Sequence, residues 1–381
     1  MPKSYDVIVV GVGTMGSAAC YHLAKQGARV LGLEKFDIPH HQGSSTGFSR
    51  AIRCSYHEHP DYVPFVRSAF AMWQDLEAET GQKLMHLTGA LYMGPEKGSA
   101  VGGALLSARK YQLPFELMNR AELGRKYPQF TVPDDFVGMF EQNAGFILPE
   151  LGVATHALRA LQLGAELHGR EGVTSWTADA NGVTVVTPRG TYHANQLVFS
   201  GGAWTDQLVK DIGVPLRVTR QVLGWVWPKN PAAFGIDRLP VWVIDRLDGS
   251  TYYGFPMMPD NPGFKLALHC PSTSADPDTV PRTVQPGDEE TFRPCLQKFI
   301  PEADGPLLSL RTCLYTYSPD RHFIIDRHPT QARVTLACGF SGHGYKFATA
   351  VGQALADLAT KGKTAHPIGF LGLSRFSSAA R

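Results

Sequence analysis

The sequence predicts an α/β (α+β) fold: a Rossmann-like dinucleotide-binding domain with an antiparallel-sheet domain inserted into it. Three observations support this prediction. A glycine-rich turn, Gly11–Gly16, lies between an apolar run and a helical pattern at the start of the chain. A second glycine cluster, Gly339–Lys346, joins an apolar run to a helical pattern near its end. Between them, residues 220–270 alternate aromatic and polar side chains, which is typical of an antiparallel sheet.

The first unit of the chain has the order strand, turn, helix, strand. Val7–Val10 has the length of a buried parallel strand, and Ser17–Gln26 follows with a helical pattern. Val30–Leu33 then predicts a second strand, and it ends at Glu34. This order around a G-x-G-x-x-G turn predicts a dinucleotide site, with the phosphates at the helix N-terminus.

Each residue type in this turn has a physical reason. Gly11 allows the tight turn, Gly13 allows the backbone to approach a pyrophosphate, and Gly16 allows the helix to pack closely on the strand. A carboxylate at Glu34 is placed to accept hydrogen bonds from a ribose diol. The expected cofactor-binding residues of this unit are Gly11, Gly13, Thr14, Met15, Gly16, Glu34 and Lys35.

The middle of the chain predicts an interleaved arrangement. Residues 40–55 have a loop composition, and helical or strand patterns follow in turn. We expect a helix around 65–76, strands at 86–95 and 136–148 separated by a helical, charged stretch around 102–127, a helix at 150–163, and strands at 182–187 and 196–204. The last strand ends in the small-residue turn that contains Gly201, as expected beside a bound nucleotide.

The end of the chain returns to the dinucleotide-binding pattern. A strand is expected at 333–338, then the second glycine cluster, then a helix with Phe347, Val351, Leu355 and Leu358 on one face. The predicted dinucleotide-binding domain is therefore discontinuous, with a second domain between its parts. The expected segments are 1–80, 150–218 and 320–375 for the dinucleotide domain, and 81–149 and 219–319 for the second domain.

Composition limits the classes of function. The 381 residues are 18% charged and 43% hydrophobic, and the net charge is +2, so neither a nucleic-acid nor a membrane surface is indicated. Six scattered cysteines without C-x-x-C spacing, and no peroxisomal address at Ser377–Arg381, fit a cytoplasmic protein. His40-His41 and His57-Glu58-His59 do not form a closed ligand set, so no metal is expected.

Several ordered motifs resemble a known family. They run through the whole chain: Gly11–Gly16, Gly43-Ser44 followed by Arg50 and Arg53, Tyr252–Pro256, Lys265-Leu266 followed by His269, Cys313–Thr316, His322–Asp326 and Gly339–Phe347. The chain resembles the monomeric sarcosine oxidase family, whose relatives include N-methyl-tryptophan oxidase and L-pipecolate oxidase. The resemblance implies FAD as cofactor, O2 as electron acceptor, a secondary amino acid as substrate, and a monomer.

The resemblance also implies roles for single residues. Cys313 matches a cysteine bonded covalently to the flavin, and Arg53 and Lys346 match the pair that holds the substrate carboxylate. Lys265 matches a lysine that activates O2, and Arg50 an arginine beside the flavin ring. The remaining expected site residues are His269, Tyr315, Tyr253 and Trp242 on the substrate side, and Ser44, Gly201, Gly339, Gly342, His343 and Gly344 (with Lys346) on the cofactor side.

One departure and several alternatives remain open. Where family members carry a His-His pair after the Gly-Ser of the arginine loop, this chain has Ser45-Thr46, which bears on the rate of flavinylation. Sarcosine is the first candidate substrate, with L-pipecolate or proline and N-methyl-tryptophan as alternatives. An NAD-dependent dehydrogenase and a non-catalytic flavin module are the two readings from other functional classes.

Overall fold

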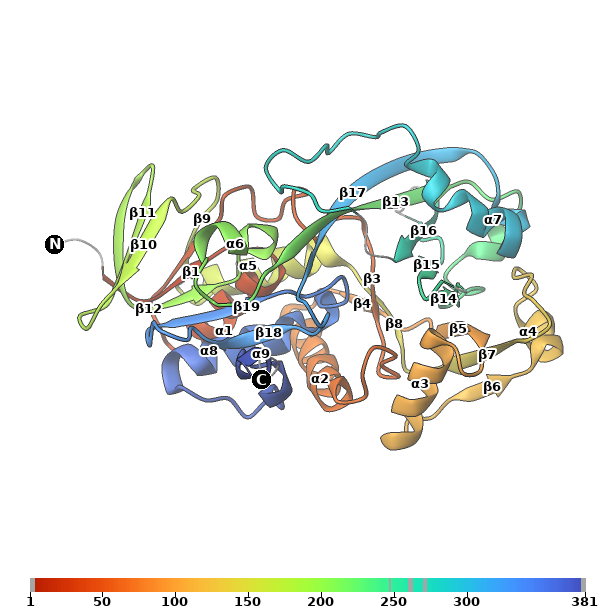
Figure 1. The fold of residues 1–381 in the computed structure, drawn as a ribbon, viewed down its shortest axis with the longest axis horizontal. Coiled ribbons are helices and arrows are strands. Elements are labelled where there is room, and N and C mark those ends of the chain that lie inside the picture. The colour runs from red at the N-terminus through yellow and green to blue at the C-terminus, as the bar shows by residue number, and fades with distance from the viewer. Residues whose placement is uncertain (1–3, 247, 260–262, 270–272, 378–381) are drawn as a thin grey trace.

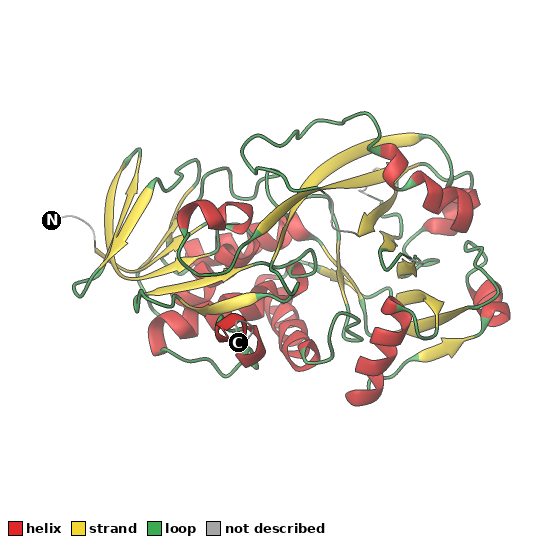
Figure 2. Ribbon diagram, viewed as in Figure 1, coloured by secondary structure: helices red, strands yellow, loops and turns green. Residues whose placement is uncertain are grey.

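The computed structural model describes residues 4–246, 248–259, 263–269 and 273–377, and it shows two halves that are each built on an eight-stranded sheet (Figure 1). Most helices lie on the sheet of one half, whereas strands dominate the other half (Figure 2). Among the described residues, no helix is long and apolar enough to cross a membrane.

The first sheet is the dinucleotide-binding sheet, and its centre is parallel. Strand β1 pairs in parallel with β2 on one side and with β12 on the other, and β12 also pairs in parallel with β19. The strand order is β10-β11-β12-β1-β2-β9, with β19 and then β18 joined to β12. The strands are β1 (Ser4–Val10), β2 (Val30–Leu33), β9 (Glu166–His168), β10 (Ser175–Ala178), β11 (Val183–Thr187), β12 (Gly190–Phe199), β18 (Ile324–Arg327) and β19 (Val334–Cys338).

Helices from both ends of the chain cover this sheet. Helix α1 (Thr14–Lys25) packs against α5 (Pro149–Gln162) and α8 (Ala348–Lys361), and α2 (Tyr62–Thr80) packs on α8. The contact between α1 and α8 is close because a Cβ at Gly352 would collide with Ala18. The expected βαβ unit and the expected C-terminal strand and helix are therefore present in the same half. Short helices α6 (Thr205–Leu208) and α9 (Ser374–Ser377) complete it.

The second sheet has the order β17-β13-β16-β15-β14-β5-β7-β6. Strands β13 to β16 pair antiparallel with one another as expected, but β5 and β14 run parallel, so the sheet is mixed. Its strands are β5 (Ala90–Pro95), β6 (Glu116–Met118), β7 (Phe136–Glu141), β13 (Arg217–Val226), β14 (Val241–Asp245), β15 (Thr251–Phe255), β16 (Phe264–His269) and β17 (Leu307–Tyr317). Helix α7 (Arg293–Phe299) packs beside it.

The prediction of a helical stretch around 102–127 is wrong for the middle of that range. Helix α3 (Ser99–Lys110) ends before Gln112, which has a positive φ of 52°, and β6 then joins the sheet. Helix α4 (Arg120–Lys126) starts afresh at a capping box formed by Asn119 and Glu122. The turn at Gln112 and the cap at Asn119 divide what the charge pattern presented as one element.

Two features connect the halves. A small sheet with the order β3-β8-β4 lies between them, formed by β3 (Arg50–Ile52), β4 (Met85–His86) and β8 (Gly145–Ile147). Strands β13 and β17 pair along a ladder from Arg217↔Tyr317 to Val226↔Leu307, which extends from the dinucleotide half into the second sheet (Figure 1). Cys270 lies outside the described residues, and the other five cysteines are free thiols.

Candidate functional site

A cavity of about 540 Å³ lies at the carboxyl ends of the parallel strands. Its wall contains both glycine clusters, from opposite ends of the sequence. The predicted cofactor-binding residues that line it are Gly11, Gly13, Thr14, Met15, Glu34, Lys35, Ser44, Gly201, Gly339, Gly342 and Gly344. Arg50 and Tyr315, which are predicted to be catalytic, line it as well. Such a crevice at the strand ends is the usual ligand site of an open α/β sheet.

The glycines of the first turn have the geometry that a bound diphosphate requires. Gly11 has a φ of +86°, and a Cβ there would lie 2.6 Å from the carbonyl oxygen of Ser200. A Cβ at Gly16 would collide with the carbonyl oxygen of Gly11, because helix and turn pack closely. At Gly13, by contrast, a Cβ would meet no atom within 4 Å, so the backbone there faces open space at the cavity wall. This open backbone position fits a dinucleotide phosphate at the start of α1.

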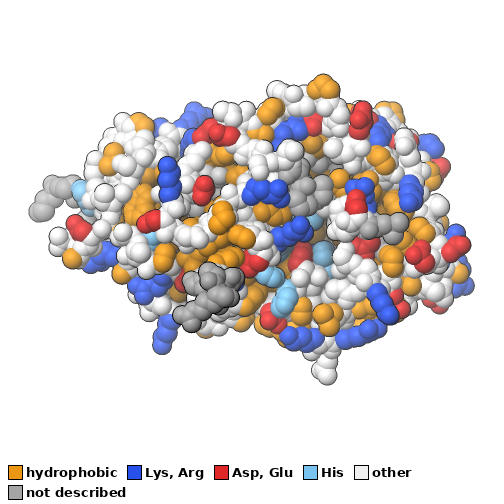
Figure 3. Space-filling view, in the orientation of Figure 1, with side chains coloured by type: hydrophobic (Ala, Val, Ile, Leu, Met, Phe, Trp, Pro, Cys, Tyr) orange, Lys and Arg blue, Asp and Glu red, His pale blue; other side chains and the backbone are white. Residues whose placement is uncertain are grey.

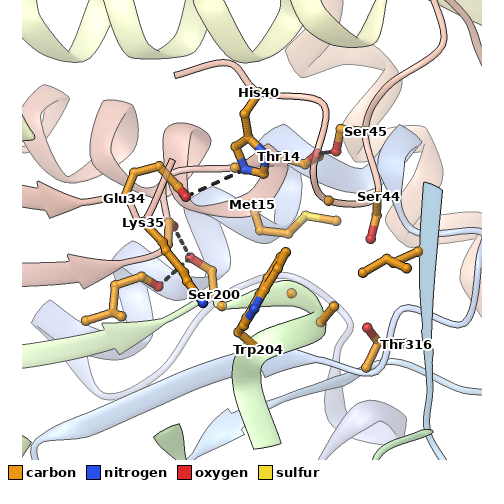
Figure 4. Close-up of a pocket in the computed structure, with 18 of the residues that line it drawn as sticks. Thr14, Met15, Glu34, Lys35, His40, Ser44, Ser45, Ser200, Trp204 and Thr316 are labelled. Carbon is orange, nitrogen blue, oxygen red and sulfur yellow. Dashed lines mark hydrogen bonds and ion pairs between the residues drawn. The ribbon is translucent and has the colours of Figure 1, made fainter. Parts of the chain in front are cut away.

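Glu34 is buried at the end of β2 and lines the same cavity. Its carboxylate accepts hydrogen bonds from the backbone N–H of Val12 at 2.8 Å and of Phe36 at 3.0 Å. His40 Nε2 lies 3.6 Å from Oε1 of this carboxylate, the oxygen that also accepts from Phe36, and Figure 4 marks the ion pair with a dashed line. Burial raises the pKa of Glu34, although the backbone hydrogen bonds oppose that rise. The position fits an acceptor for a ribose hydroxyl.

The loop before β3 forms another wall of the cavity. The hydroxyls of Thr14 and Ser45 are hydrogen-bonded, which ties this loop to the first glycine turn. Arg50 holds the loop from within, since its guanidinium donates to the carbonyl oxygens of Ser44 at 2.8 Å and Thr46 at 2.6 Å. The arginine side chain therefore shapes the loop as well as adding positive charge to the cavity.

A second, smaller cavity of about 80 Å³ adjoins the first. Arg50, Tyr315, Gly342 and Tyr345 line both. It brings together Arg53, Tyr253, His269, His343 and Lys346 from the predicted set, and its other lining residues include His57, Glu58, Val241, Val243, Thr251 and Phe255. On the face drawn in Figure 3, histidine and basic side chains gather near the middle of the molecule.

Arg53 and Glu58 form the strongest charge pair of this cavity. Nη2 of Arg53 donates to both carboxylate oxygens of Glu58, at 2.6 and 2.7 Å. The guanidinium also lies 4.6 Å from the ring centroid of Tyr56. Burial acts against charge on both partners, but each holds the other ionised: the pKa of Arg53 is raised and that of Glu58 is lowered. A carboxylate that enters this cavity therefore meets a cation already paired.

Lys346 also lines the small cavity and is buried. Its Nζ donates to the carbonyl oxygen of His343 at 2.7 Å and lies 5.2 Å from the ring centroid of Tyr56. Burial, together with the nearby charge of Arg53, lowers the pKa of Lys346 to about 7. A second cation that loses its proton near neutral pH is thus available beside the first.

Tyrosine and histidine side chains form the wall between the two cavities. The hydroxyls of Tyr253 and Tyr315 lie 3.4 Å apart, and the rings of His269 and Tyr315 are 5.4 Å apart. Gly342 has a φ of +84°, and a Cβ there would collide with the Tyr315 ring. Burial lowers the pKa of His269 to about 4, so its imidazole is neutral at pH 7. This wall presents polar groups without adding charge.

The structure does not place Lys265 in the lining of either cavity. Its Nζ is buried and donates to the carbonyl oxygens of Gly47 at 2.7 Å and Ser49 at 2.9 Å, and to the Ser49 hydroxyl at 3.0 Å. Burial and the charge of Arg50 lower its pKa well below the usual value. Lys265 therefore lies behind the arginine loop and fixes its backbone.

Cys313 is also behind the cavity wall rather than in it. The thiol is fully buried among Leu223, Trp225 and Ala267 on β17's inner face. Burial raises its pKa, which opposes thiolate formation, while the charges of Arg50 and Lys265 act in the other direction. Its neighbours Leu314, Tyr315 and Thr316 line the large cavity.

Trp242 does not line the small cavity, contrary to expectation. Its side chain is fully buried on the other face of β14, against Phe264 and Phe130. Val243 pairs with Tyr253 across β14 and β15, and these two residues face the cavity. Trp242 pairs with Gly254, where a Cβ would collide with the indole ring. The tryptophan therefore fills the core space that this glycine leaves open.

Sequence reasoning missed two partners in the site. The sequence pattern shows Glu58 only between two histidines that do not form a metal site, yet its carboxylate accepts hydrogen bonds from Arg53. Glu150, at the start of α5, accepts hydrogen bonds from the backbone N–H of Gly47 at 2.7 Å and lines the large cavity. The sequence signal available for Glu58 was its spacing of five residues from Arg53, which is too common to be specific.

Comparison with known proteins agrees with this geometry. Residues 6–358 match the family model described as FAD dependent oxidoreductase. The chain is 42% identical to a monomeric sarcosine oxidase of Streptomyces avermitilis, with 100% of both chains covered, and 34% identical to an N-methyl-L-tryptophan oxidase of Yersinia pestis, covering 98% of this chain and 99% of that protein. The solved structure of NikD, an unusual amino acid oxidase essential for nikkomycin biosynthesis, is 25% identical with a TM-score of 0.85 over 97% of each chain.

Proposed function

This chain is an FAD-dependent amine oxidase that belongs to the FAD-dependent oxidoreductase family, and on that premise we propose that it oxidises a small secondary α-amino acid, with sarcosine as the first candidate. The observation that carries this proposal is the small cavity with Arg53 and Lys346 in its wall. Two buried cations suit a carboxylate, and the cavity shares Arg50, Tyr315 and Gly342 with the dinucleotide cavity. A substrate held there lies against the cofactor site.

Arg53 and Lys346 bind the substrate carboxylate in different ways. Arg53 offers a planar fork to a carboxylate, and Lys346 offers a point charge. For Arg53 to bind the substrate, its bond to Glu58 must be shared or exchanged. The same positive charges lower the pKa of the substrate ammonium group, because two cations disfavour a third. The neutral amine that results is the form that can lose hydride.

FAD, when bound, would supply the acceptor for a hydride from the carbon next to the amine nitrogen and a route for the two electrons to O2, which would be reduced to H2O2. The organic product is an imine, which water hydrolyses to a primary amine and an aldehyde. From sarcosine these products are glycine and formaldehyde. The protein contributes the carboxylate clamp, the neutral polar wall of Tyr253, Tyr315 and His269, and exclusion of bulk water.

The volume of the cavity supports a small substrate. It measures about 80 Å³, and the aliphatic and aromatic side chains of Val241, Val243 and Phe255 bound it. Sarcosine needs the least room, and L-pipecolate or proline add only a short aliphatic ring. An indole side chain needs much more space, which disfavours N-methyl-tryptophan. L-Pipecolate or proline oxidation is therefore the second candidate.

We further propose that Cys313 forms the covalent link to FAD, that Lys265 promotes the reaction with O2, and that the protein acts as a cytoplasmic monomer. The role of Lys265 in the reaction with O2 is supported by its position: its buried amine hydrogen-bonds to the loop that carries Arg50. At Cys313, burial raises the thiol pKa, and the charges of Arg50 and Lys265 act in the opposite direction, toward a thiolate. The segments 1–80, 150–218 and 320–375 are proposed to bind FAD, and 81–149 and 219–319 to bind substrate.

The test is anaerobic mixing of the purified yellow protein with sarcosine, L-pipecolate, L-proline or N-methyl-L-tryptophan. We expect sarcosine to bleach the flavin absorbance fastest, and admission of O2 to restore it with formation of peroxide. No bleaching with any of the four compounds would contradict the proposed substrate class. Absence of visible absorbance, even after reconstitution with FAD, would contradict the cofactor.

A further inference from the structure

A segment of the second half reaches across to the mouth of the dinucleotide cavity. This segment, residues 274–288, follows β16 and is called the strap below. In Figure 1 it runs along β13 and β17 toward α6. Ser274 forms a bridge with Thr219, and the backbone N–H of Ala275 donates to the carbonyl oxygen of Val218 at 2.8 Å. The strap therefore starts on β13.

The far end of the strap is fixed by one arginine of β13. The Asp288 carboxylate accepts hydrogen bonds from both Nη atoms of Arg220, at 2.6 and 2.7 Å. Arg220 also donates hydrogen bonds to the carbonyl oxygens of Pro281 and Thr283. This bidentate pair is largely buried, with exposed side-chain fractions of 17% and 7%. A bidentate arginine pair of this kind is geometrically specific. Both ends of the strap are thus held by β13.

Three residues of the strap contact the other half. The Arg282 guanidinium lies 6.0 Å from the Trp204 ring centroid, Val280 packs in a cluster with Ala203 and Trp204, and the Asp278 carboxylate forms hydrogen bonds. Asp278 accepts hydrogen bonds from Lys35 Nζ at 2.6 Å, from Trp204 Nε1 at 2.8 Å and from Gln207 Nε2 at 2.9 Å. All three donors belong to residues that line the dinucleotide cavity. Figure 4 shows Trp204 rising from the ribbon into this cavity, on the side away from Thr14.

The donors also contact one another. Lys35 Nζ lies 5.3 Å from the Trp204 ring centroid, and the rings of Phe36 and Trp204 are 5.1 Å apart. An isolated exposed ion pair such as Lys35–Asp278 contributes little to the stability of the fold. Here, however, one carboxylate accepts hydrogen bonds from an amine, an indole and an amide, so it holds three residues of the cavity wall in place together.

This wall lies at the adenosine end of the cavity. The opposite end is marked by Tyr315 and Gly342, which the dinucleotide cavity shares with the small cavity. Lys35 directly follows Glu34, the acceptor for the ribose hydroxyls, and therefore belongs to the nucleoside half. The flavin ring must lie near the small cavity, so the adenosine half lies near Lys35 and Trp204.

We propose that Asp278 is a positioning residue for the cofactor: the strap holds Lys35 and Trp204 against the adenosine half of FAD and slows its release. The inference rests on the proposed FAD site. It adds that retention of the cofactor depends on a segment of the substrate half. FMN lacks the adenosine half, so its binding does not depend on the strap.

The experiment uses Asp278→Asn in the full chain with Cys313→Ala, so that the cofactor can exchange. The dissociation constants of FAD and FMN are measured by quenching of flavin fluorescence. We expect FAD to bind roughly tenfold more weakly than to the Cys313→Ala parent, with FMN unchanged. Asp206→Asn, which removes the same charge from neighbouring α6, is the matched control and is expected to leave both constants unchanged.

Equal weakening of FAD and FMN, or no weakening of FAD, would overturn the proposal. Should Asp278→Asn not fold, Trp204→Phe removes one donor from the other side and keeps an aromatic ring, and the same selective loss of FAD affinity is expected. If the parent itself binds no FAD, the proposed function fails. If the parent binds FAD and both Asp278→Asn and Trp204→Phe bind it equally well, only the proposed role of the strap is contradicted.

Discussion

The Arg53 guanidinium is bound by Glu58 through one nitrogen and both carboxylate oxygens, at 2.6 and 2.7 Å, inside the small cavity. The cation proposed for the substrate carboxylate thus already has an internal carboxylate partner. Substrate binding is then an exchange of one carboxylate for another, and its free energy contains the cost of weakening the Arg53–Glu58 pair.

The Glu58→Gln variant tests this exchange. It keeps the side-chain shape but removes the competing negative charge, so we expect a several-fold lower KM for sarcosine and tighter binding of acetate. The unpaired buried arginine should also lower the Tm of the ligand-free protein, and acetate should recover part of that loss. A higher KM would mean that Glu58 assists substrate binding instead.

The Arg53→Ala variant tests the clamp itself. Removal of one partner of a buried hydrogen-bonded charge pair costs about 2 to 5 kcal/mol, which corresponds to at least roughly a thirtyfold higher KM. Arg53→Lys keeps the charge but loses the planar fork, and we expect an intermediate KM. Steady-state kinetics with sarcosine measure both, and an unchanged KM for Arg53→Ala would remove this residue from the clamp.

Lys346 predicts a pH dependence of carboxylate binding. Because burial lowers its pKa to about 7, the amine is charged below pH 7 and neutral above it. We expect the dissociation constant of acetate, which has no amine of its own, to rise as the pH increases through 7. Lys346→Arg should remove this rise, since arginine keeps its proton. A slope that persists in Lys346→Arg would assign the titration to another group.

Lys265→Met separates the two half-reactions. If Lys265 holds a proton when O2 is reduced, despite its lowered pKa, its charge stabilises the negative charge that develops on reduced oxygen, and removal of one such group typically costs about 10² to 10³ in rate. Stopped-flow measurements should therefore show much slower reoxidation by O2 and a smaller effect on reduction by sarcosine. Since Lys265 also fixes Gly47 and Ser49, equal slowing of both steps would indicate a purely structural role.

Cys313→Ala tests the covalent link. Acid precipitation of the parent protein should leave yellow colour in the pellet, whereas the variant should release it to the supernatant. Cys338→Ala, which removes another buried free thiol from β19, is the matched control and should behave as the parent. Colour that stays in the Cys313→Ala pellet would exclude a bond at this residue.

The dinucleotide half was predictable because its signals are local. Gly11, Gly13 and Gly16 lie within six residues, and the strand and helix beside them follow simple periodicities. The structure places Gly11, Gly13, Glu34 and glycines of the second cluster around one cavity, as expected, whereas Gly16 is not among its lining residues. The turn at Gln112 was missed because a positive φ at a non-glycine residue has no strong sequence signal.

The second half was less predictable because its side-chain directions depend on strand register. Once Tyr253 is known to face the small cavity, alternation places Val243 beside it and Trp242 on the other face. The sequence does not reveal which residues pair across strands, so Trp242 was assigned to the wrong face. The parallel contact of β5 with β14 is a similar long-range feature.

The ladder of β13 and β17 belongs to both halves at once. A ribbon hydrogen-bonded without interruption from Arg217 to Trp225 resists bending, so the two halves cannot open by a free hinge between them. We therefore expect access to the small cavity to depend on the side chains and loops around it, and turnover to be insensitive to solvent conditions that slow only large domain rotations.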